Sequence, residues 1–406
     1  MQKVILGTFC SLYHPKQERK MDLENETLVS VKLFTKYERY QMGTNTISLP
    51  IRFSRYELSK LVNEALGLEN PIPFDFIVDG KLLRVSLSEY MSEHGISSET
   101  VVNLEYVPII SRPEEKSSSD LPDWVSGIAS DGTVYVAGCY DGTVHVYDMN
   151  DQLLCEKTIH KKPIKAVACK NSMIATASLD NTVQVNQIQN KSILHVATLT
   201  GHDSHVLDCQ FSSDAHYLVS SAWNGSILIW DTSKFSDVTE VEPVHTLSET
   251  MQGVSAVAWK DLNVITGGWD HHIRIWDLES EGMLTDLKGN KVVNQVDFCP
   301  GNNLIVSCHP DGIRLWDSRQ EKPNILTFSG LRDWVSDVLW HPTNTNTLIS
   351  CSYEGGVSVY DIRSTFPLHS VAGVHHGKAF CECWKNENEL LTGGEDKKMK
   401  RLSLQM

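Results

Sequence analysis

Apolar residues in the first part of the chain recur with a helical period in one place. Between residues 54 and 67 they lie three and four positions apart, as on one buried face of a helix. These residues are Leu58, Leu61, Val62, Ala65 and Leu66. Ser54 and Glu57 have the spacing of a capping box at the helix start, and Gly67 supplies a stop. We therefore predict an amphipathic helix over residues 54–67.

Runs of apolar and alternating residues around this helix are typical of strands. These runs are residues 29–34, 46–53, 74–78, 81–85 and 101–107. Only short elements are expected between residues 86 and 100. A hairpin, a crossing helix and further strands in this order predict an α+β ubiquitin-like β-grasp domain, which we place at residues 27–109.

A different pattern begins after residue 123 and repeats along the rest of the chain. Seven related segments can be aligned, at residues 135–148, 174–187, 218–231, 264–277, 305–317, 348–361 and 390–403. Their turn residues are Asp141, Asp180, Asn224, Asp270, Asp311, Glu354 and Asp396, spaced by 39, 44, 46, 41, 43 and 42 residues. This period is close to the ~40–45 residues of WD40 repeats. We predict an all-β seven-bladed WD40 propeller over residues 124–406.

The better copies contain the residue types of a buried hydrogen-bonded chain that links strands within one blade. The predicted members are His202, Ser220, Asn224 and Trp230 in the third copy, Thr266, Asp270 and Trp276 in the fourth, and Ser307, Asp311 and Trp316 in the fifth. Asn186 and Leu402 replace tryptophan in the second and seventh copies. We therefore expect those two blades to lack the network and to be held by apolar packing.

The chain ends directly after the third strand of the last copy, so a fourth strand for that blade has to come from upstream. Residues 110–123 have no clear periodicity and are rich in Ser, Pro and charge. We expect this segment to be both a linker and the closure strand of the ring.

Composition and charge exclude several classes of function. The net charge is -15, and residues 111–406 hold 24 Lys and Arg against 37 Asp and Glu, which argues against a general nucleic-acid binder. No stretch approaches the ~20 apolar residues of a membrane span. The ten cysteines lack the spacing of a zinc site and are expected to be reduced. Residues 1–26 do not resemble a signal peptide, and we expect a poorly ordered extension there.

Signatures of catalysis are absent from the sequence. It contains no phosphate loop, no HExxH zinc helix and no GxSxG elbow. The pairs His271-His272 and His375-His376 lie beside turns and are better explained as surface or network residues. Trp223, Trp269, Tyr140 and Tyr353 precede turn residues, where they could pack between blades or form an aromatic contact surface. We predict a protein that is not an enzyme and binds no cofactor of its own.

The polar loop of Ser97, Ser98, Glu99 and Thr100 precedes the strand at residues 101–107. An exposed glutamate in such a loop is usually just solvated. The residues alone assign it no other role.

The chain resembles one family of ribosome-biogenesis factors, the WD repeat-containing protein 12 family. The resemblance is carried by RYELSKLVNEALG, PIPFDFIVDGKLLRVSL, HGISSETVVNLEY, DWVSGIASDG and GCYDGTVHVYD, and it extends over residues 29–406. It implies a non-enzymatic assembly factor in ribosomal RNA processing and maturation of the pre-60S particle. The implied partners are pescadillo and a WD protein of the block-of-proliferation type, which the propeller contacts. The implied location is the nucleus, with the nucleolus and nucleoplasm.

In this family the ubiquitin-like domain engages midasin, a giant AAA ATPase, and the glutamate of the GxSSE loop corresponds to Glu99. The resemblance therefore implies that Glu99, flanked by Ser97 and Ser98, completes the coordination of Mg²⁺ held by midasin, because this hard cation prefers oxygen ligands.

Two alternatives remain open. Related factors of the Notchless type share the domain and the glutamate but have a longer WD array, which the seven copies argue against. A substrate adaptor of a ubiquitin ligase would need neither Mg²⁺ nor Glu99. Direct contact with RNA stays undecided, and no membrane partner is expected.

Overall fold

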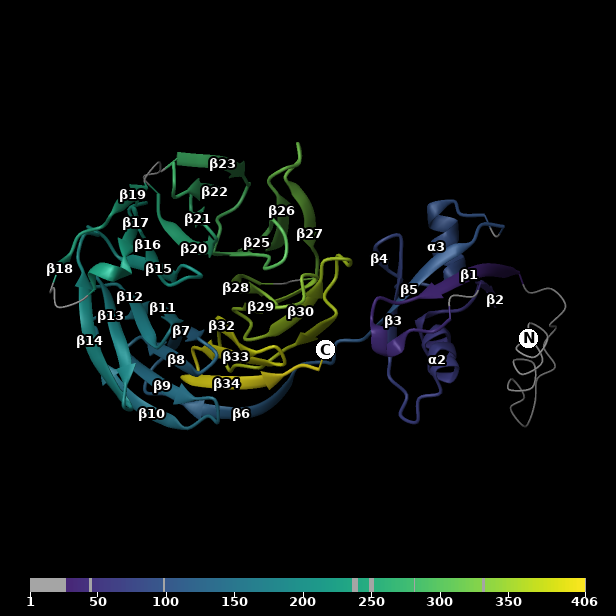
Figure 1. The fold of residues 1–406 in the computed structure, drawn as a ribbon, viewed down its shortest axis with the longest axis horizontal. Coiled ribbons are helices and arrows are strands. Elements are labelled where there is room, and N and C mark those ends of the chain that lie inside the picture. Colours follow the sequence, from purple (N-terminus) through teal and green to yellow (C-terminus); the bar gives the residue numbers. More distant parts are fainter. Residues whose placement is uncertain are drawn as a thin grey trace. The chain divides into compact units, whose positions relative to one another are not determined.

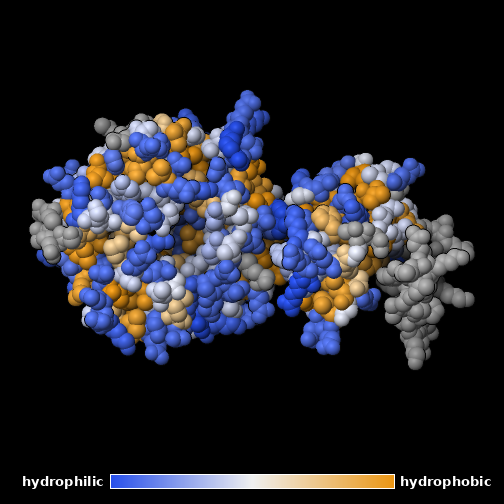
Figure 2. Space-filling model, viewed as in Figure 1, coloured by the Kyte–Doolittle hydropathy of each residue, from blue (hydrophilic) through white to orange (hydrophobic). Residues whose placement is uncertain are grey.

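A computed structural model describes residues 27–43, 46–97, 99–235, 240–247, 252–280, 282–330 and 333–405. The chain divides into two compact units, with the boundary after Ile109 (Figure 1). The expected extension at residues 1–26 lies outside the described residues. Hydrophilic side chains separate smaller apolar areas on the visible face of each unit (Figure 2).

The first unit is a five-stranded sheet with strand order β2-β1-β5-β3-β4. Strand β1 pairs in parallel with β5 and antiparallel with β2. Its elements are β1 (Leu28–Phe34), η2 (Glu38–Tyr40), β2 (Thr46–Pro50), α2 (Arg55–Leu66), β3 (Phe74–Val78), β4 (Lys81–Leu82), α3 (Leu87–His94) and β5 (Val102–Pro108).

Helix α2 begins and ends as predicted. The Ser54 backbone N–H donates to the Glu57 carboxylate over 3.0 Å, and both halves of the capping box are present. Gly67 has a left-handed conformation and terminates the helix. Leu58, Leu61 and Val62 are buried in a core that includes Phe74 and Phe76 of β3. The predicted amphipathic helix is therefore confirmed.

The structure differs from the prediction after two of the strands. Strand β2 ends at Pro50 because the Phe53 N–H turns back to the Pro50 carbonyl. The region expected to hold short elements contains α3, whose capping box pairs Ser86 with Glu89. An eight-residue helix makes too few turns for its apolar period to be distinctive.

The second unit contains seven sheets within its described residues, numbered I to VII here in chain order. Sheet I comprises β7 (Val125–Ser130), β8 (Val134–Cys139), β9 (Thr143–Asp148) and β10 (Leu153–Thr158). Sheet II comprises β11 (Ile164–Lys170), β12 (Met173–Ser178), β13 (Val183–Gln189), β14 (Ser192–Leu199) and β18 (Glu240–Val241). Sheet III comprises β15 (Val206–Phe211), β16 (Tyr217–Ala222), β17 (Ile227–Asp231) and β19 (His245–Leu247), with η3 (Thr232–Lys234) after β17. Sheet IV comprises β20 (Val254–Lys260), β21 (Asn263–Gly268), β22 (His272–Asp277) and β23 (Gly282–Lys288).

The remaining three sheets have four strands each. Sheet V comprises β24 (Gln295–Phe298), β25 (Leu304–His309), β26 (Gly312–Asp317) and β27 (Asn324–Phe328). Sheet VI comprises β28 (Val335–Trp340), β29 (Thr347–Ser352), β30 (Val357–Asp361) and β31 (His369–Val371). Sheet VII comprises β32 (Ala379–Asn386), β33 (Glu389–Gly394), β34 (Lys398–Ser403) and β6 (Glu114–Asp120).

The first strands of these sheets form a closed ring. Each contacts the next in the order β7, β11, β15, β20, β24, β28 and β32, and β32 contacts β7 again. Buried carboxylates connect some of these neighbours: Asp208 accepts a hydrogen bond from the Val257 N–H (2.9 Å) and Asp337 from the Glu382 N–H (3.0 Å). The second unit is therefore a β-propeller (Figure 1).

Sheet VII is built from both ends of the second unit. Strand β6 precedes the ring in sequence and pairs antiparallel with β34, from Lys398 opposite Asp120 to Ser403 opposite Glu114. This pairing joins the first strand of the unit to its last one. It ties the ring closed through backbone hydrogen bonds.

Candidate functional site

Glu99 lies in a short loop between α3 and β5. Its backbone N–H donates to the Ser97 hydroxyl (3.3 Å), and the Thr100 N–H donates to the Ser97 carbonyl (3.0 Å). Ser97 thus shapes the turn, whereas Ser98 lies outside the described residues. Glu99 is exposed, and its carboxylate has no hydrogen-bond or ion-pair partner within the described part of the chain.

Both ends of this loop are anchored in the core of the first unit. Gly95 ends α3 in a left-handed conformation with φ of 64°, and the Ile96 N–H donates to the Met91 carbonyl (2.9 Å). Ile96 packs against the core, and Val102 is buried. The loop can therefore present the Glu99 carboxylate from a fixed base. Among the described residues, no group of three His, Cys, Asp or Glu side chains could hold a metal ion.

In sheet III the predicted network residues form one hydrogen-bonded chain. The Trp230 indole N–H donates to the Ser220 hydroxyl (2.9 Å), which lies 2.7 Å from His202 Nε2. His202 Nδ1 lies 2.8 Å from Ser226, and the Ser226 hydroxyl donates to the Asn224 side-chain oxygen (2.8 Å). Ser226, which we did not predict, links the histidine to the turn.

A neutral histidine accounts for the hydrogen bonds of this network. Burial lowers the pKa of His202 to about 4. A neutral ring with its proton on Nδ1 accepts from Ser220 and donates to Ser226, so every donor in the chain has an acceptor. The network therefore links the strands and the turn of sheet III through hydrogen bonds.

Sheets IV and V contain only part of the predicted network. The Trp276 indole donates to the Thr266 hydroxyl (2.9 Å) and the Trp316 indole to the Ser307 hydroxyl (2.7 Å). The turn residues bind elsewhere: Asp270 pairs with Arg274 at 2.7 Å and Asp311 with Arg314 at 3.0 Å. Among the described residues, neither aspartate joins the Trp pair of its sheet. Adjacent arginines compete for these carboxylates because charge-assisted hydrogen bonds are stronger.

The expectation that the second and seventh copies lack the network was wrong. In sheet II, His160 Nδ1 lies 2.8 Å from Asp180 and Nε2 lies 2.8 Å from the Thr176 hydroxyl. In sheet VII, His375 makes the equivalent contacts to Asp396 (2.8 Å) and Thr392 (2.9 Å). The chain of Asp, His and Thr does not need the tryptophan, because the hydroxyl can bind the histidine without receiving the indole proton.

Asn186 occupies the position of the missing tryptophan in sheet II. It is buried, and its side-chain nitrogen has no hydrogen-bond partner in the described structure. Sheet VII has Leu402 at the equivalent position. We expect Asn186→Leu to raise the free energy of unfolding by about 1 kcal/mol, because it removes an unsatisfied buried donor. Chemical denaturation followed by tryptophan fluorescence tests this, with Leu402→Asn as the reciprocal variant. A loss of stability in Asn186→Leu would contradict it.

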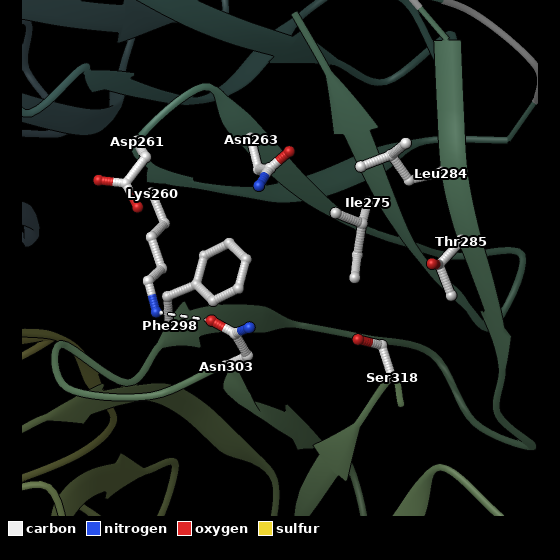
Figure 3. Close-up of a pocket in the computed structure, with 9 residues that line it drawn as sticks. All are labelled: Lys260, Asp261, Asn263, Ile275, Leu284, Thr285, Phe298, Asn303 and Ser318. Carbon is white, nitrogen blue, oxygen red and sulfur yellow. Dashed lines mark hydrogen bonds between the residues drawn. The ribbon is translucent and has the colours of Figure 1, made fainter. Parts of the chain in front are cut away.

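A cavity of about 160 Å³ lies between sheets IV and V and contains none of the predicted site residues (Figure 3). Lys260 Nζ donates to the Cys299 carbonyl (3.3 Å) and to Asn303 (3.2 Å), and lies 5.5 Å from the Phe298 ring centre. Lys260 is the only cation among the described residues that line the cavity. Because these internal contacts occupy it, we assign the cavity no catalytic role.

The helices and the cysteines of the described part of the chain were the remaining candidates for a membrane or thiol function. None of its helices is long and apolar enough to cross a membrane. The cysteines it contains are free thiols. Burial raises the pKa of the Cys139 thiol to about 12, so this side chain is a poor nucleophile at neutral pH.

Three families match successive parts of the sequence. Residues 29–91 match the NLE (NUC135) domain, residues 90–305 a β-propeller described as Vps42 beta-propeller, and residues 322–361 the WD domain, G-beta repeat. The first match coincides with the β1 to α3 part of the first unit, and the others fall largely on the ring.

Whole-length relatives carry one shared description, "Ribosome biogenesis protein WDR12 homolog". The chain is 31% identical to the one from Drosophila virilis, over 93% of this chain and 96% of the relative. It is 29% identical to that of Nematostella vectensis (91% and 98%) and 28% identical to that of Arabidopsis thaliana (94% and 98%). Both units are therefore covered by each of these relatives.

Proposed function

The chain belongs to the family of ribosome biogenesis proteins described as WDR12 homologs, and from this premise we propose that it is a non-enzymatic assembly factor of the large ribosomal subunit. Its role lies in ribosome biogenesis. The finer proposal is that it acts in ribosomal RNA processing and pre-60S maturation, in the nucleolus and nucleoplasm. The family membership supports this.

The proposed architecture is a ubiquitin-like β-grasp domain followed by a seven-bladed WD40 propeller. A mixed sheet with a parallel β1–β5 pair and a packed helix α2 supports the first assignment. Seven sheets in a ring and Trp-Asp pairs such as Trp230-Asp231 support the second. In this proposal the ring contacts a WD partner of the block-of-proliferation type in a complex with pescadillo.

The observation that carries the proposal is the exposed Glu99 carboxylate. It projects from a loop anchored at Gly95 and Val102 and has no partner among the described residues. A carboxylate oxygen is a suitable ligand for an open position on Mg²⁺. We therefore assign Glu99 as the ligand that the first unit offers to the metal site of midasin, so that ATP-driven force removes the factor from the particle.

Calorimetric titration of the full chain with the metal-binding adhesion domain of midasin tests this assignment. We expect binding in Mg²⁺ and none in EDTA. Glu99→Ala and Glu99→Gln should each weaken the affinity about tenfold or more, because each removes the metal ligand. A tenfold loss of affinity corresponds to ~1.4 kcal/mol of binding free energy. Glu93→Gln is the matched control, because Glu93 is also an exposed glutamate and lies in the last turn of α3.

Two outcomes would contradict the assignment. Binding that ignores Mg²⁺ and Glu99 would favour the adaptor of a ubiquitin ligase. Equal losses in the Glu93 and Glu99 variants would show that negative charge in general, and not one metal ligand, attracts the partner.

A further inference from the structure

Aromatic side chains from three consecutive sheets form one continuous cluster beside the starts of the first strands β28, β32 and β7. We call it the aromatic arc: Trp334 and Tyr353 of sheet VI, Lys378 and Phe380 of sheet VII, and Trp124 and Tyr140 of sheet I. Ring centres of Trp334 and Tyr353 lie 5.9 Å apart, and those of Trp124 and Tyr140 lie 5.2 Å apart. Phe380 joins the two pairs, at 6.1 Å from Tyr353 and 5.8 Å from Trp124.

The arc follows from one repeated position in the ring. In sheets VI, VII and I, the residue before the first strand accepts, through its carbonyl, a hydrogen bond from the backbone of the residue before the turn. Tyr140 donates to Trp124 (3.0 Å), Tyr353 to Trp334 (3.0 Å) and Glu395 to Lys378 (2.8 Å). Because β28 contacts β32 and β32 contacts β7, a Lys and Glu pair lies between two Trp and Tyr pairs.

The structure already contains a cation on this surface. Lys378 Nζ lies 5.1 Å from the centre of the Tyr353 ring. Among the described residues, no carboxylate is within ion-pair distance of this ammonium, and Glu395 binds the Lys378 backbone N–H (3.2 Å) instead. The face of the Tyr353 ring therefore interacts with the Lys378 ammonium, as in a cation–π contact.

The surrounding charge favours further cations. The loops that carry the arc also carry Asp123, Asp141, Asp333, Glu354 and Glu395. The sequence of these loops also contains the cations Arg332, Lys378 and Lys397, which are fewer than the carboxylates, and Lys397 pairs with Asp123 at 3.3 Å. Trp334 is 41% exposed and is accessible to a partner. Loops rich in carboxylates around an exposed Trp334 ring repel phosphate and attract guanidinium or ammonium groups.

We propose that the aromatic arc is a docking site for a basic segment of a partner protein. Arginine or lysine side chains of that segment stack on Trp334 and Trp124, as Lys378 does on Tyr353, and the loop carboxylates attract them. This inference does not rest on the role in ribosome assembly.

Binding of a basic probe peptide to the full chain tests the proposal. The probe is an octapeptide of four Gly-Arg repeats, titrated by calorimetry and by quenching of tryptophan fluorescence. We expect Trp334→Ala to weaken binding about tenfold. Trp269→Ala is the matched control and is expected to bind like wild type, because Trp269 is 38% exposed but packs on Trp223 in another part of the ring.

Lys378→Ala distinguishes a cation site from an anion site. Removing the resident ammonium frees the Tyr353 face, so the Gly-Arg peptide is expected to bind at least as tightly as to wild type. Weaker binding of the peptide to this variant would overturn the proposal. So would equal losses in the Trp334 and Trp269 variants, an absence of peptide binding, or tighter binding of a Gly-Glu octapeptide or of oligouridylate.

Discussion

Replacing Asp151 with asparagine is expected to lower the free energy of unfolding of the second unit by about 3 kcal/mol, because it removes the nearer carboxylate from a buried ammonium and leaves only Glu389, at 4.0 Å. Lys385 Nζ lies 2.5 Å from Asp151, and the Lys385 side chain is only 1% exposed. Asparagine keeps the shape of the side chain and tolerates the left-handed backbone of residue 151, whose φ is 66°. The loss of stability in this variant therefore measures the contribution of the Asp151 charge.

Asp151 connects sheet I with sheet VII at the point where the ring closes. Its carboxylate also accepts hydrogen bonds from Tyr135 (3.0 Å) and Ser117 (3.1 Å) and pairs with Arg401 (3.1 Å). Burial alone would raise the pKa of Asp151, but the hydrogen bonds from Lys385 and Tyr135 outweigh it and lower the pKa below its ordinary value. This stabilisation is present at neutral pH and is lost as the pH falls through the folded-state pKa.

Tryptophan fluorescence measures this effect selectively, because all ten tryptophans lie in the second unit. Asp148→Asn is the control from the same turn and should leave the denaturation midpoint close to that of wild type. In a Lys385→Met background, Asp151→Asn should cost much less. An equal loss in both backgrounds would show that the ion pair does not stabilise the closure.

Replacing Glu382 with valine is expected to raise the free energy of unfolding by about 2 kcal/mol at pH 8, since a buried carboxyl without partners is destabilising. Glu382 is 3% exposed, and neither carboxyl oxygen has a hydrogen-bond partner among the described residues. The equivalent residue of sheet VI is Val338, which is fully buried. Valine therefore suits this position between sheets.

The gain should depend on pH. Burial, followed by the charges of Asp337 and Asp297, raises the pKa of Glu382 well above its ordinary value of 4.5. The folded protein consequently binds this proton more tightly than the unfolded chain, and stability is lost as the pH rises above 4.5 towards the folded-state pKa. Denaturation of wild type and Glu382→Val should diverge between pH 5 and pH 8, by up to ~2 kcal/mol.

Glu382→Gln separates ionisation from polarity. The amide cannot ionise but remains polar and buried, so this variant should match wild type at pH 5 and exceed it at pH 8. A stability difference that is constant over this range would mean that Glu382 does not titrate between the two conditions.

Local signals allowed parts of both units to be predicted. The capping box of Ser54 and Glu57 and the stop at Gly67 act within a few residues, so helix α2 could be read from the sequence. Helix α3 was missed, although Ser86 and Glu89 form the same box, because its eight residues show too little apolar period. Its capping signal could have revealed it.

Partners of the turn residues were harder to predict. Asp270 and Asp311 carry the residue type of the repeat, yet they bind Arg274 and Arg314, which lie four and three residues away. A repeat alignment compares equivalent positions and ignores such neighbours. The histidine contacts of Asp180 and Asp396 differ from the prediction for a related reason. The hydrogen bonds among Asp, His and Thr form without the tryptophan, so a missing tryptophan does not predict a missing network.

The sequence by itself determined the repeat period, the helix α2 with its caps, the family resemblance and the position of Glu99 in a polar loop, because each depends on residues close together in the chain. Only the tertiary structure decided which distant residues meet. Ring closure brings Asp151 to Lys385, places Glu382 between two sheets and aligns Trp124 with Phe380. The contacts of Asp151 with Lys385 and of Trp124 with Phe380 join segments more than 200 residues apart, and their geometry is set by how the sheets pack around the ring.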